Sequence, residues 1–115
     1  MKETENRALL AVYCVVAQQL RDTETRLGEY ARAIEEFGLD GPGAALGPVR
    51  CRDGWLTPSE ILSRARALAC QVEQLTARST AARDQVLTCI LAQSANFAEY
   101  KRLRTQYVDC IDDAC

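Results

Sequence analysis

Residues 59–115 read SEILSRARALACQVEQLTARSTAARDQVLTCILAQSANFAEYKRLRTQYVDCIDDAC, and this stretch contains neither glycine nor proline. One stripe of mostly apolar residues recurs through it at alternating intervals of four and three. The stripe consists of Ile61, Ala65, Leu68, Val72, Leu75, Ser79, Ala82, Val86, Cys89, Gln93, Asn96, Tyr100, Leu103, Tyr107, Cys110 and Ala114. This spacing is a heptad seam, which keeps one face of a helix toward a partner helix. The stretch therefore predicts a long helix that associates with other helices.

The start of this helix carries a complete N-terminal signal. Thr57 is placed as the N-cap, Pro58 fits the first helical position, and Glu60 is the acid of a capping box. Leu56 and Ile61 are spaced as a hydrophobic staple on either side of the cap. We therefore expect the helix to begin at Pro58.

An earlier helix is predicted from Glu3 to Phe37. Its seam consists of Leu9, Tyr13, Val16, Leu20, Thr23, Leu27, Tyr30, Ile34 and Phe37. Gly38 follows where a left-handed C-cap residue is favoured. Within residues 8–17, Leu10, Val12 and Val15 lie outside this seam. The apolar surface there is too wide for one neighbouring helix to cover, so we expect more than one neighbour.

Residues 38–57 form a connection that contains Gly38, Gly41, Pro42, Gly43, Gly47 and Pro48. Residues of these types interrupt regular elements, so we expect an irregular loop between the helices. Leu46, Val49 and Trp55 are placed to fold back onto the helix ends. We expect Trp55 to anchor the loop to the protein's own core, with contact to a partner as the alternative.

The fold class that follows is all-α: an antiparallel helical hairpin with one long C-terminal heptad helix, in a single coiled-coil-like domain over residues 1–115. The second helix, if continuous to residue 114, is longer than the first, and its last residues have no partner in the same chain. The alternative is a three-helix bundle with a break near residues 76–80, a polar stretch without glycine, proline or asparagine.

Composition argues against catalysis. The chain has 115 residues, of which 48% are apolar and 26% charged, as in folded soluble proteins, and its net charge of −2 does not favour nucleic acid. It lacks histidine, the commonest general base and metal ligand. No phosphate-binding loop, nucleophile elbow or metal-ligand spacing occurs. We expect no enzymatic activity, cofactor, metal site or small-molecule substrate.

The cysteines are Cys14, Cys51, Cys70, Cys89, Cys110 and Cys115, and their spacing matches no zinc pattern. We interpret Cys14, Cys70, Cys89 and Cys110 as small buried residues on helices. A disulfide framework is the alternative. Cys115 is expected to be an exposed thiol.

The apolar run Ala8–Ala17 is the one segment that resembles part of a targeting signal. It is too short to span a bilayer, and Glu3 and Glu5 offset the basic residues that a signal peptide needs at its start. We therefore expect no membrane association and a reducing compartment, either the cytoplasm or the nucleus.

Two charged clusters lie near the C-terminus: the acids Asp109, Asp112 and Asp113, and the bases Lys101, Arg102 and Arg104. We expect the acids to be solvated and the last helical turn to fray unless a basic surface meets them, because acids there oppose the helix dipole. The bases, set between Tyr100 and Tyr107, give too weak a footprint to favour nucleic acid.

Two helices alone bury little apolar surface for a chain of this size. The sequence therefore favours a non-enzymatic scaffolding subunit that contributes two helices to a hetero-oligomeric helical bundle with other helical subunits of a multi-protein complex. The alternatives are a self-sufficient three-helix or homodimeric four-helix adaptor, and a nucleic-acid-associated helical protein. The candidate partner-contact residues are Leu10, Val12, Val15, Ile90, Phe97, Tyr100, Leu103, Tyr107 and Ile111.

Overall fold

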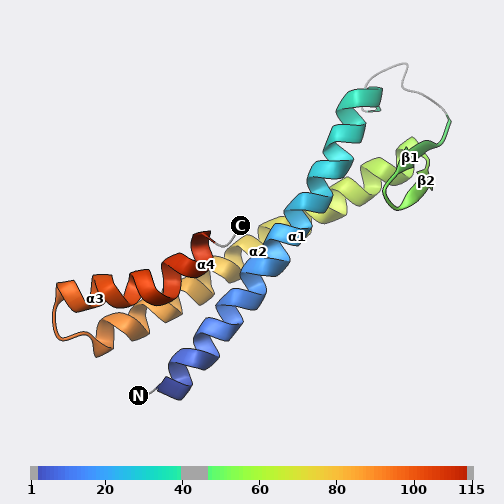
Figure 1. The fold of residues 1–115 in the computed structure, drawn as a ribbon. Coiled ribbons are helices and arrows are strands. Elements are labelled where there is room, and N and C mark those ends of the chain that lie inside the picture. The colour runs from blue at the N-terminus through green and yellow to red at the C-terminus, as the bar shows by residue number, and fades with distance from the viewer. Residues whose placement is uncertain (1–2, 40–46, 114–115) are drawn as a thin grey trace. The chain divides into compact units, whose positions relative to one another are not determined.

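A computed structural model describes residues 3–39 and 47–113 of the chain (Figure 1). The elements are α1 (Glu3–Phe37), β1 (Val49–Cys51), β2 (Gly54–Leu56), α2 (Pro58–Gln93), α3 (Phe97–Arg104), the π-helix η1 (Thr105–Asp109) and α4 (Cys110–Asp113). The chain divides into two compact units. Unit 1 combines Met1–Arg21 with Gln74–Cys115, and unit 2 is Asp22–Glu73. The predictions made for Leu46 and Cys115 fall outside the described residues.

The C-terminal end of α1 and the start of α2 are where local sequence signals place them. Helix α1 has the predicted bounds, and Gly38 follows it with a φ of 60°, the left-handed conformation of a C-cap glycine. Helix α2 begins at Pro58. The Glu60 amide donates to Thr57 Oγ1 over 3.2 Å, and the Thr57 amide donates to Glu60 Oε1 over 3.3 Å, which confirms the capping box.

Unit 2 contains the connection between the long helices, and part of that connection is regular. Strands β1 and β2 pair antiparallel, with Val49 opposite Leu56 and Arg50 opposite Trp55. The prediction of an irregular loop is therefore wrong for residues 49–56. The physical reason is a two-residue alternation too short to stand out: Val49 and Leu56 are buried on one face, while Arg50 and Trp55 are exposed on the other.

The core of unit 2 joins this hairpin to both long helices. Its buried residues are Tyr30, Leu39, Val49, Leu56, Ile61 and Leu68. The C-terminal half of α1 therefore packs with the N-terminal half of α2, and the predicted staple pair is buried within the same cluster.

Unit 1 pairs the opposite halves of the same helices. Its buried core consists of Tyr13, Ala17, Ala82, Val86, Ile90 and Val108. The start of α1 thus packs against the end of α2, while in unit 2 the end of α1 packs against the start of α2. This reversed order confirms the antiparallel hairpin of two long helices.

The extent of the second helix differs from the prediction. Helix α2 passes through residues 76–80 without a break and ends at Gln93, so neither a continuous helix to residue 114 nor a turn at 76–80 is found. The chain turns at residues 94–96, where Asn96 accepts a hydrogen bond from the Glu99 amide over 2.9 Å as the N-cap of α3. Asn96 is a cap rather than a seam residue because its side chain offers the new helix an acceptor.

The C-terminal segment α3–η1–α4 packs against the rest of unit 1 and does not extend beyond it. A π-helix carries an extra residue per turn, so η1 shifts the apolar stripe by one position. Val108 is fully buried and Ile111 half-buried, while the predicted seam residues Tyr107 and Cys110 are exposed. The unpartnered overhang expected from the sequence is therefore absent.

Candidate protein-interaction surfaces

Helix α1 carries an exposed apolar face in unit 1. Val12 is 53% exposed and Val15 56% exposed. Ala8 and Ala11 are exposed on the same side, since residues three and four apart share a helix face. The core residue Tyr13 lies on the opposite side of the helix. Residues 8–17 of α1 are thus apolar around the circumference of the helix, and the rest of unit 1 covers only part of that surface.

A groove between α1 and α2 adjoins this face. It has a volume of about 430 Å³ and is lined by Leu9, Asp84, Gln85, Thr88, Cys89 and Ala92. Leu9 is one helical turn from Val12, so the valine stands at the border of the groove. We call Ala8, Ala11, Val12 and Val15 together with this groove the α1–α2 surface.

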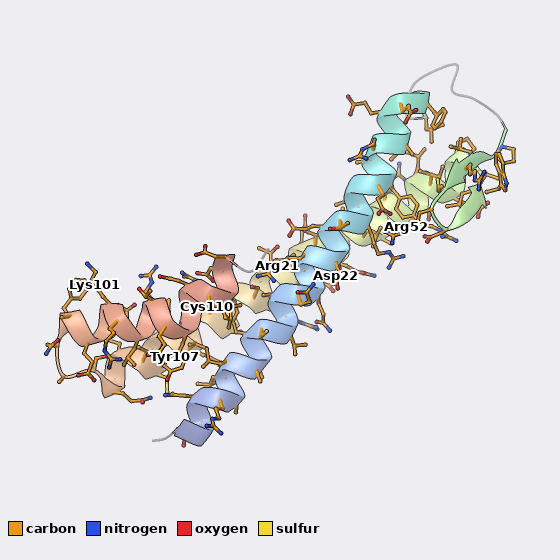
Figure 2. All side chains as sticks on the ribbon, viewed as in Figure 1. Arg21, Asp22, Arg52, Lys101, Tyr107 and Cys110 are labelled. Atoms are coloured by element: carbon orange, nitrogen blue, oxygen red, sulfur yellow. The ribbon has the colours of Figure 1, made fainter. Side chains whose placement is uncertain are left out.

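A second apolar area flanks the turn between α2 and α3. Leu91 and Phe97 are both largely exposed. The Phe97 ring stacks on Tyr100 with a centroid distance of 6.1 Å, and Lys101 Nζ lies 5.4 Å from the Phe97 centroid. Lys101 extends outward from α3 (Figure 2). Phe97, Tyr100 and Lys101 therefore already contact one another within α3.

The nine predicted contact residues are not equally available to a partner. Val12, Val15, Phe97 and Tyr107 are exposed, whereas Leu10, Tyr100, Leu103 and Ile111 are half-buried against the unit 1 core. Ile90 is only 3% exposed and belongs to that core. Ile90 therefore does not belong to a partner surface, because its apolar side chain is already buried in the core of unit 1.

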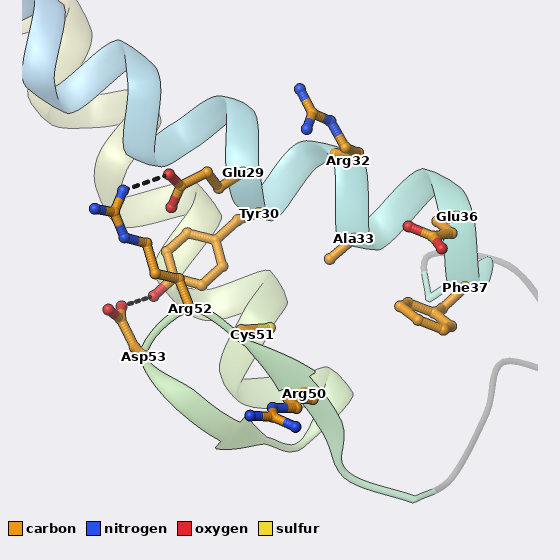
Figure 3. Close-up of a pocket in the computed structure, with 10 residues that line it drawn as sticks. All are labelled: Glu29, Tyr30, Arg32, Ala33, Glu36, Phe37, Arg50, Cys51, Arg52 and Asp53. Atoms are coloured by element: carbon orange, nitrogen blue, oxygen red, sulfur yellow. Dashed lines mark hydrogen bonds and ion pairs between the residues drawn. The ribbon is translucent and has the colours of Figure 1, made fainter.

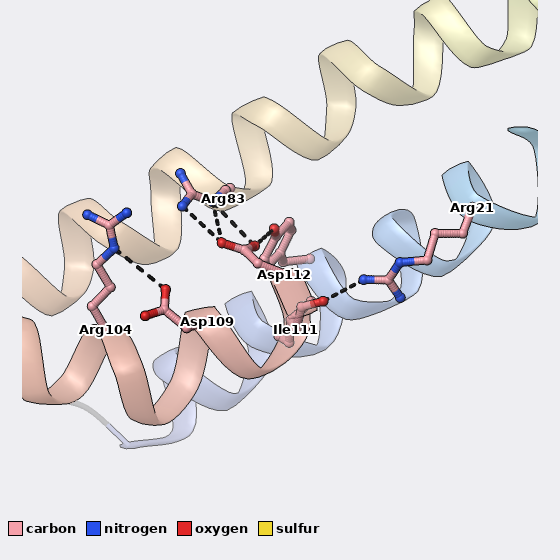
Figure 4. A network of polar contacts seen from close by, with 7 residues as sticks. Arg21, Arg83, Arg104, Asp109, Ile111 and Asp112 are labelled. Atoms are coloured by element: carbon pink, nitrogen blue, oxygen red, sulfur yellow. Dashed lines mark hydrogen bonds and ion pairs between the residues drawn. The ribbon is translucent and has the colours of Figure 1, made fainter. Parts of the chain in front are cut away.

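A polar network fastens the C-terminal segment to α1 and α2 (Figure 4). Arg83 donates to Asp112 from Nε over 3.1 Å and from Nη2 over 3.0 Å, and the Tyr13 hydroxyl donates to the same carboxylate. Arg21 donates to the carbonyl of Ile111. The expectation of a solvated acid is thus wrong for Asp112, because a cation of the same chain meets it.

Two groups of this network, the phenol of Tyr13 and the carboxyl of Asp112, titrate far from neutral pH. Burial, and then the hydrogen bond to Asp112, raise the pKa of Tyr13 to about 12. Burial alone would raise the pKa of Asp112, but the hydrogen bonds from Arg83 and Tyr13 outweigh it and lower that pKa below its usual range. Near pH 7 the phenol is neutral and the carboxylate charged, which suits a structural tie better than proton transfer.

Unit 2 has a pocket of about 260 Å³ between the end of α1 and β1 (Figure 3). At one end Arg52 pairs with Glu29 over 2.9 Å. The Tyr30 hydroxyl donates to Asp53 and accepts from Arg64 over 3.3 Å. The hydrogen bond from Tyr30 lowers the pKa of Asp53. The acids at this end therefore already have partners.

A more apolar groove adjoins this pocket and shares Phe37 and Arg50 with it. Its volume is about 420 Å³, and its lining consists of Phe37, Gly47, Pro48, Val49, Arg50 and Trp55. We call it the Trp55 groove. Trp55 is 68% exposed, so the prediction that it anchors the loop to the core is wrong, while Val49 is buried as predicted. No sequence motif indicates this groove, because it depends on the unpredicted hairpin.

The cysteines also differ from the prediction. Cys14, Cys70 and Cys110 are exposed, and Cys51 and Cys89 are half-buried, so the interpretation of the helical cysteines as buried residues is wrong. The thiols of Cys14, Cys51, Cys89 and Cys110 form no disulfide within the described residues. Cys110 is exposed because η1 moves it off the buried stripe.

Neither a metal cluster nor a membrane span is found over residues 3–39 and 47–113. No three or more Cys, Asp or Glu side chains are grouped so as to hold a metal ion there. In the same residues, no helix is sufficiently long and apolar to cross a membrane.

Comparisons with protein-family models, with curated proteins and with solved structures find no match to this chain.

Proposed function

We propose that this chain is a non-enzymatic scaffolding subunit that binds a helix of another protein through the α1–α2 surface of unit 1. The observation that supports the proposal is the exposure of Val12 and Val15 within residues 8–17, a run of α1 that contains no charged residue, beside an open groove. Burying one such valine contributes about 1.5 kcal/mol or more.

The shape of the surface favours a helix as the occupant. A groove between two antiparallel helices accepts a third helix by ridges-into-grooves or knobs-into-holes packing. Unit 1 already combines α1, α2 and the α3–η1–α4 segment. A helix from a partner would complete a four-helix arrangement, so that α1 and α2 contribute two helices to a hetero-oligomeric bundle.

The cellular setting that goes with this proposal is a reducing one, in the cytoplasm or the nucleus. It rests on the thiols of Cys14, Cys51, Cys89 and Cys110, which form no disulfide within the described residues and of which Cys14 and Cys110 are exposed.

The test is purification of the tagged full-length chain from its native source, with identification of the proteins that co-purify. A variant carrying both Val12→Asp and Val15→Asp should lose its partner while keeping its helical circular dichroism, because both side chains are exposed. Ala98→Asp, which adds one aspartate at an exposed position of α3, is the control for added negative charge. Retention of the same partner by the double variant would contradict the proposal.

A second candidate function is a self-sufficient adaptor that forms a homodimer through the same surface. The observation that favours it is the full burial of Val108, which shows that the C-terminal segment covers the core of its own unit. Sedimentation equilibrium of the isolated chain separates the two candidates. A dimer that dissociates on Val12→Asp and Val15→Asp supports the adaptor, and a monomer supports the hetero-oligomeric subunit.

The nucleic-acid alternative has the weakest support. Lys101 lies over Phe97, Arg102 donates to Gln106 over 3.5 Å, and Arg104 pairs with Asp109 over 3.7 Å. Each base of the cluster thus has a contact within its own segment, which reduces what the cluster offers to phosphates.

A further inference from the structure

We propose that unit 2 carries a separate binding site, the Trp55 groove, for an extended peptide segment of a partner protein in which an apolar side chain stands next to an acidic one. Every residue of this site lies in unit 2, and none belongs to the α1–α2 surface. The inference is therefore independent of the function proposed for unit 1.

Two aromatic side chains supply the apolar part of the site. Trp55 is 68% exposed and Phe37 45% exposed, and both line the same groove with Pro48 and Val49. An exposed tryptophan offers a large apolar surface to a ligand, and tryptophan is enriched among the residues that dominate binding energies. A volume of about 420 Å³ accommodates a leucine- or proline-sized side chain and its neighbours.

Arg50 supplies the charge of the site. Within residues 3–39 and 47–113 it is the one charged side chain that lines the groove, and it lies opposite Trp55 on the exposed face of the hairpin. Among the described residues it has no ion pair, whereas Arg52 pairs with Glu29 and Arg64 pairs with Asp53. An unpaired guanidinium beside an aromatic wall is suited to bind a carboxylate.

The site is held in place before any ligand arrives. Val49 and Leu56 fix the inner face of the hairpin in the unit 2 core. At the turn, Asp53 accepts a hydrogen bond from Tyr30 of α1, and Arg52 pairs with Glu29 of the same helix (Figure 3). Preorganisation of this kind reduces the entropy lost on binding.

The combination favours a peptide over nucleic acid. One arginine gives little affinity for a phosphate backbone. The apolar lining, by contrast, needs an apolar side chain to exclude water from the two rings. An acidic peptide with interleaved apolar residues satisfies both parts of the groove.

The experiment uses the intrinsic fluorescence of the full chain, because Trp55 is its only tryptophan. The probe is a synthetic peptide that alternates leucine with aspartate and contains no aromatic residue. Its titration should shift the emission of Trp55 to shorter wavelengths. The matched peptide with lysine in place of aspartate should bind at least about tenfold more weakly, since it brings like charge to Arg50.

Variants test the two parts separately. Arg50→Glu should reverse the preference toward the lysine peptide, and Phe37→Ala should weaken binding of the aspartate peptide by about tenfold. Arg66→Glu makes the same charge change at an exposed position of α2 in unit 2 and should leave binding unchanged. An absent emission shift, equal binding of the two peptides, or an Arg50→Glu variant that behaves as the wild type would each overturn the proposal.

The two proposals fail independently. The Val12→Asp and Val15→Asp variant should bind the aspartate peptide as the wild type does, because its substitutions lie in unit 1. Loss of peptide binding in that variant would contradict the assignment of the site to unit 2.

Discussion

Tyr13 connects burial to alkaline stability. In the folded chain its pKa is raised to about 12, whereas in the unfolded chain a tyrosine has a pKa near 10. As the pH rises, the unfolded chain therefore loses the Tyr13 proton at a lower pH than the folded chain does. The contribution of a raised pKa is complete below about pH 10 and is lost as the pH rises toward 12. We expect the free energy of unfolding to fall by about 2 kcal/mol over that interval, measured by urea denaturation. Tyr13→Phe should remove this part of the decline, while Tyr107→Phe at a more exposed ring should not. An unchanged decline in Tyr13→Phe would contradict the assignment.

Asp112 gives the opposite dependence at acid pH. Its pKa is lowered in the folded chain, so its stabilising contribution is present above the unfolded value of about 3.9 and is lost as the pH falls through the folded pKa. Asp112→Asn should cost about 1–2 kcal/mol at pH 7, because Arg83 loses its charged acceptor. The variant should also lose less stability below about pH 4 than the wild type. Asp113→Asn, at an exposed position, is the control, and equal unfolding midpoints for the two variants would sink the assignment.

At the scale of single elements, glycines in two conformations offer a matched comparison. Gly54 begins β2 with a φ of 112°, and Gly28 lies inside α1; an added Cβ meets no atom within 4 Å at either site. An alanine at either position therefore changes the free energy of unfolding only through the backbone conformation. We expect Gly54→Ala to destabilise by about 1 kcal/mol or more and Gly28→Ala to stabilise by up to about 1 kcal/mol. Thermal unfolding followed by circular dichroism measures both, and shifts of the same sign would contradict the backbone argument.

The elements also show which features the sequence alone could predict. The C-terminal end of α1 and the start of α2 were predictable because Gly38, Thr57 and Glu60 act within one turn of their own position. The turn at residues 94–96 was missed, because it holds no glycine or proline and its local signal, the N-cap Asn96, fits the heptad seam as well. This turn is favoured by the burial of Val108 against residues that are distant in the sequence. The phase shift in η1 could not be predicted either, because a heptad pattern does not reveal a π-helix.

At the scale of the whole molecule, the two candidate surfaces also differ in how far the sequence alone could predict them. The exposed valines of the α1–α2 surface follow from an apolar run wider than any one neighbour could cover, which is readable in residues 8–17. The Trp55 groove requires Phe37, Arg50 and Trp55 to meet through a short hairpin. Its strands are only three residues long, too short for periodicity to identify.

The division into two units predicts which segments lose protection against amide exchange when a core side chain is shortened. Each unit has its own buried cluster, so removing a core side chain should loosen mainly the unit that contains it. Val108→Ala should cost about 2 kcal/mol and speed amide exchange in α3–η1–α4 and in Ala82–Ile90. Under the same conditions the hairpin at Val49–Leu56 should keep its protection.

Ile61→Ala is the reciprocal variant, because Ile61 is fully buried in the cluster of unit 2. It should speed exchange in the hairpin and in the adjoining start of α2, with the C-terminal segment unaffected. Hydrogen exchange read segment by segment by mass spectrometry distinguishes the two patterns. If either variant accelerated exchange equally in both units, the two clusters would behave as one cooperative core, and binding at the α1–α2 surface would then be expected to stabilise the Trp55 groove as well.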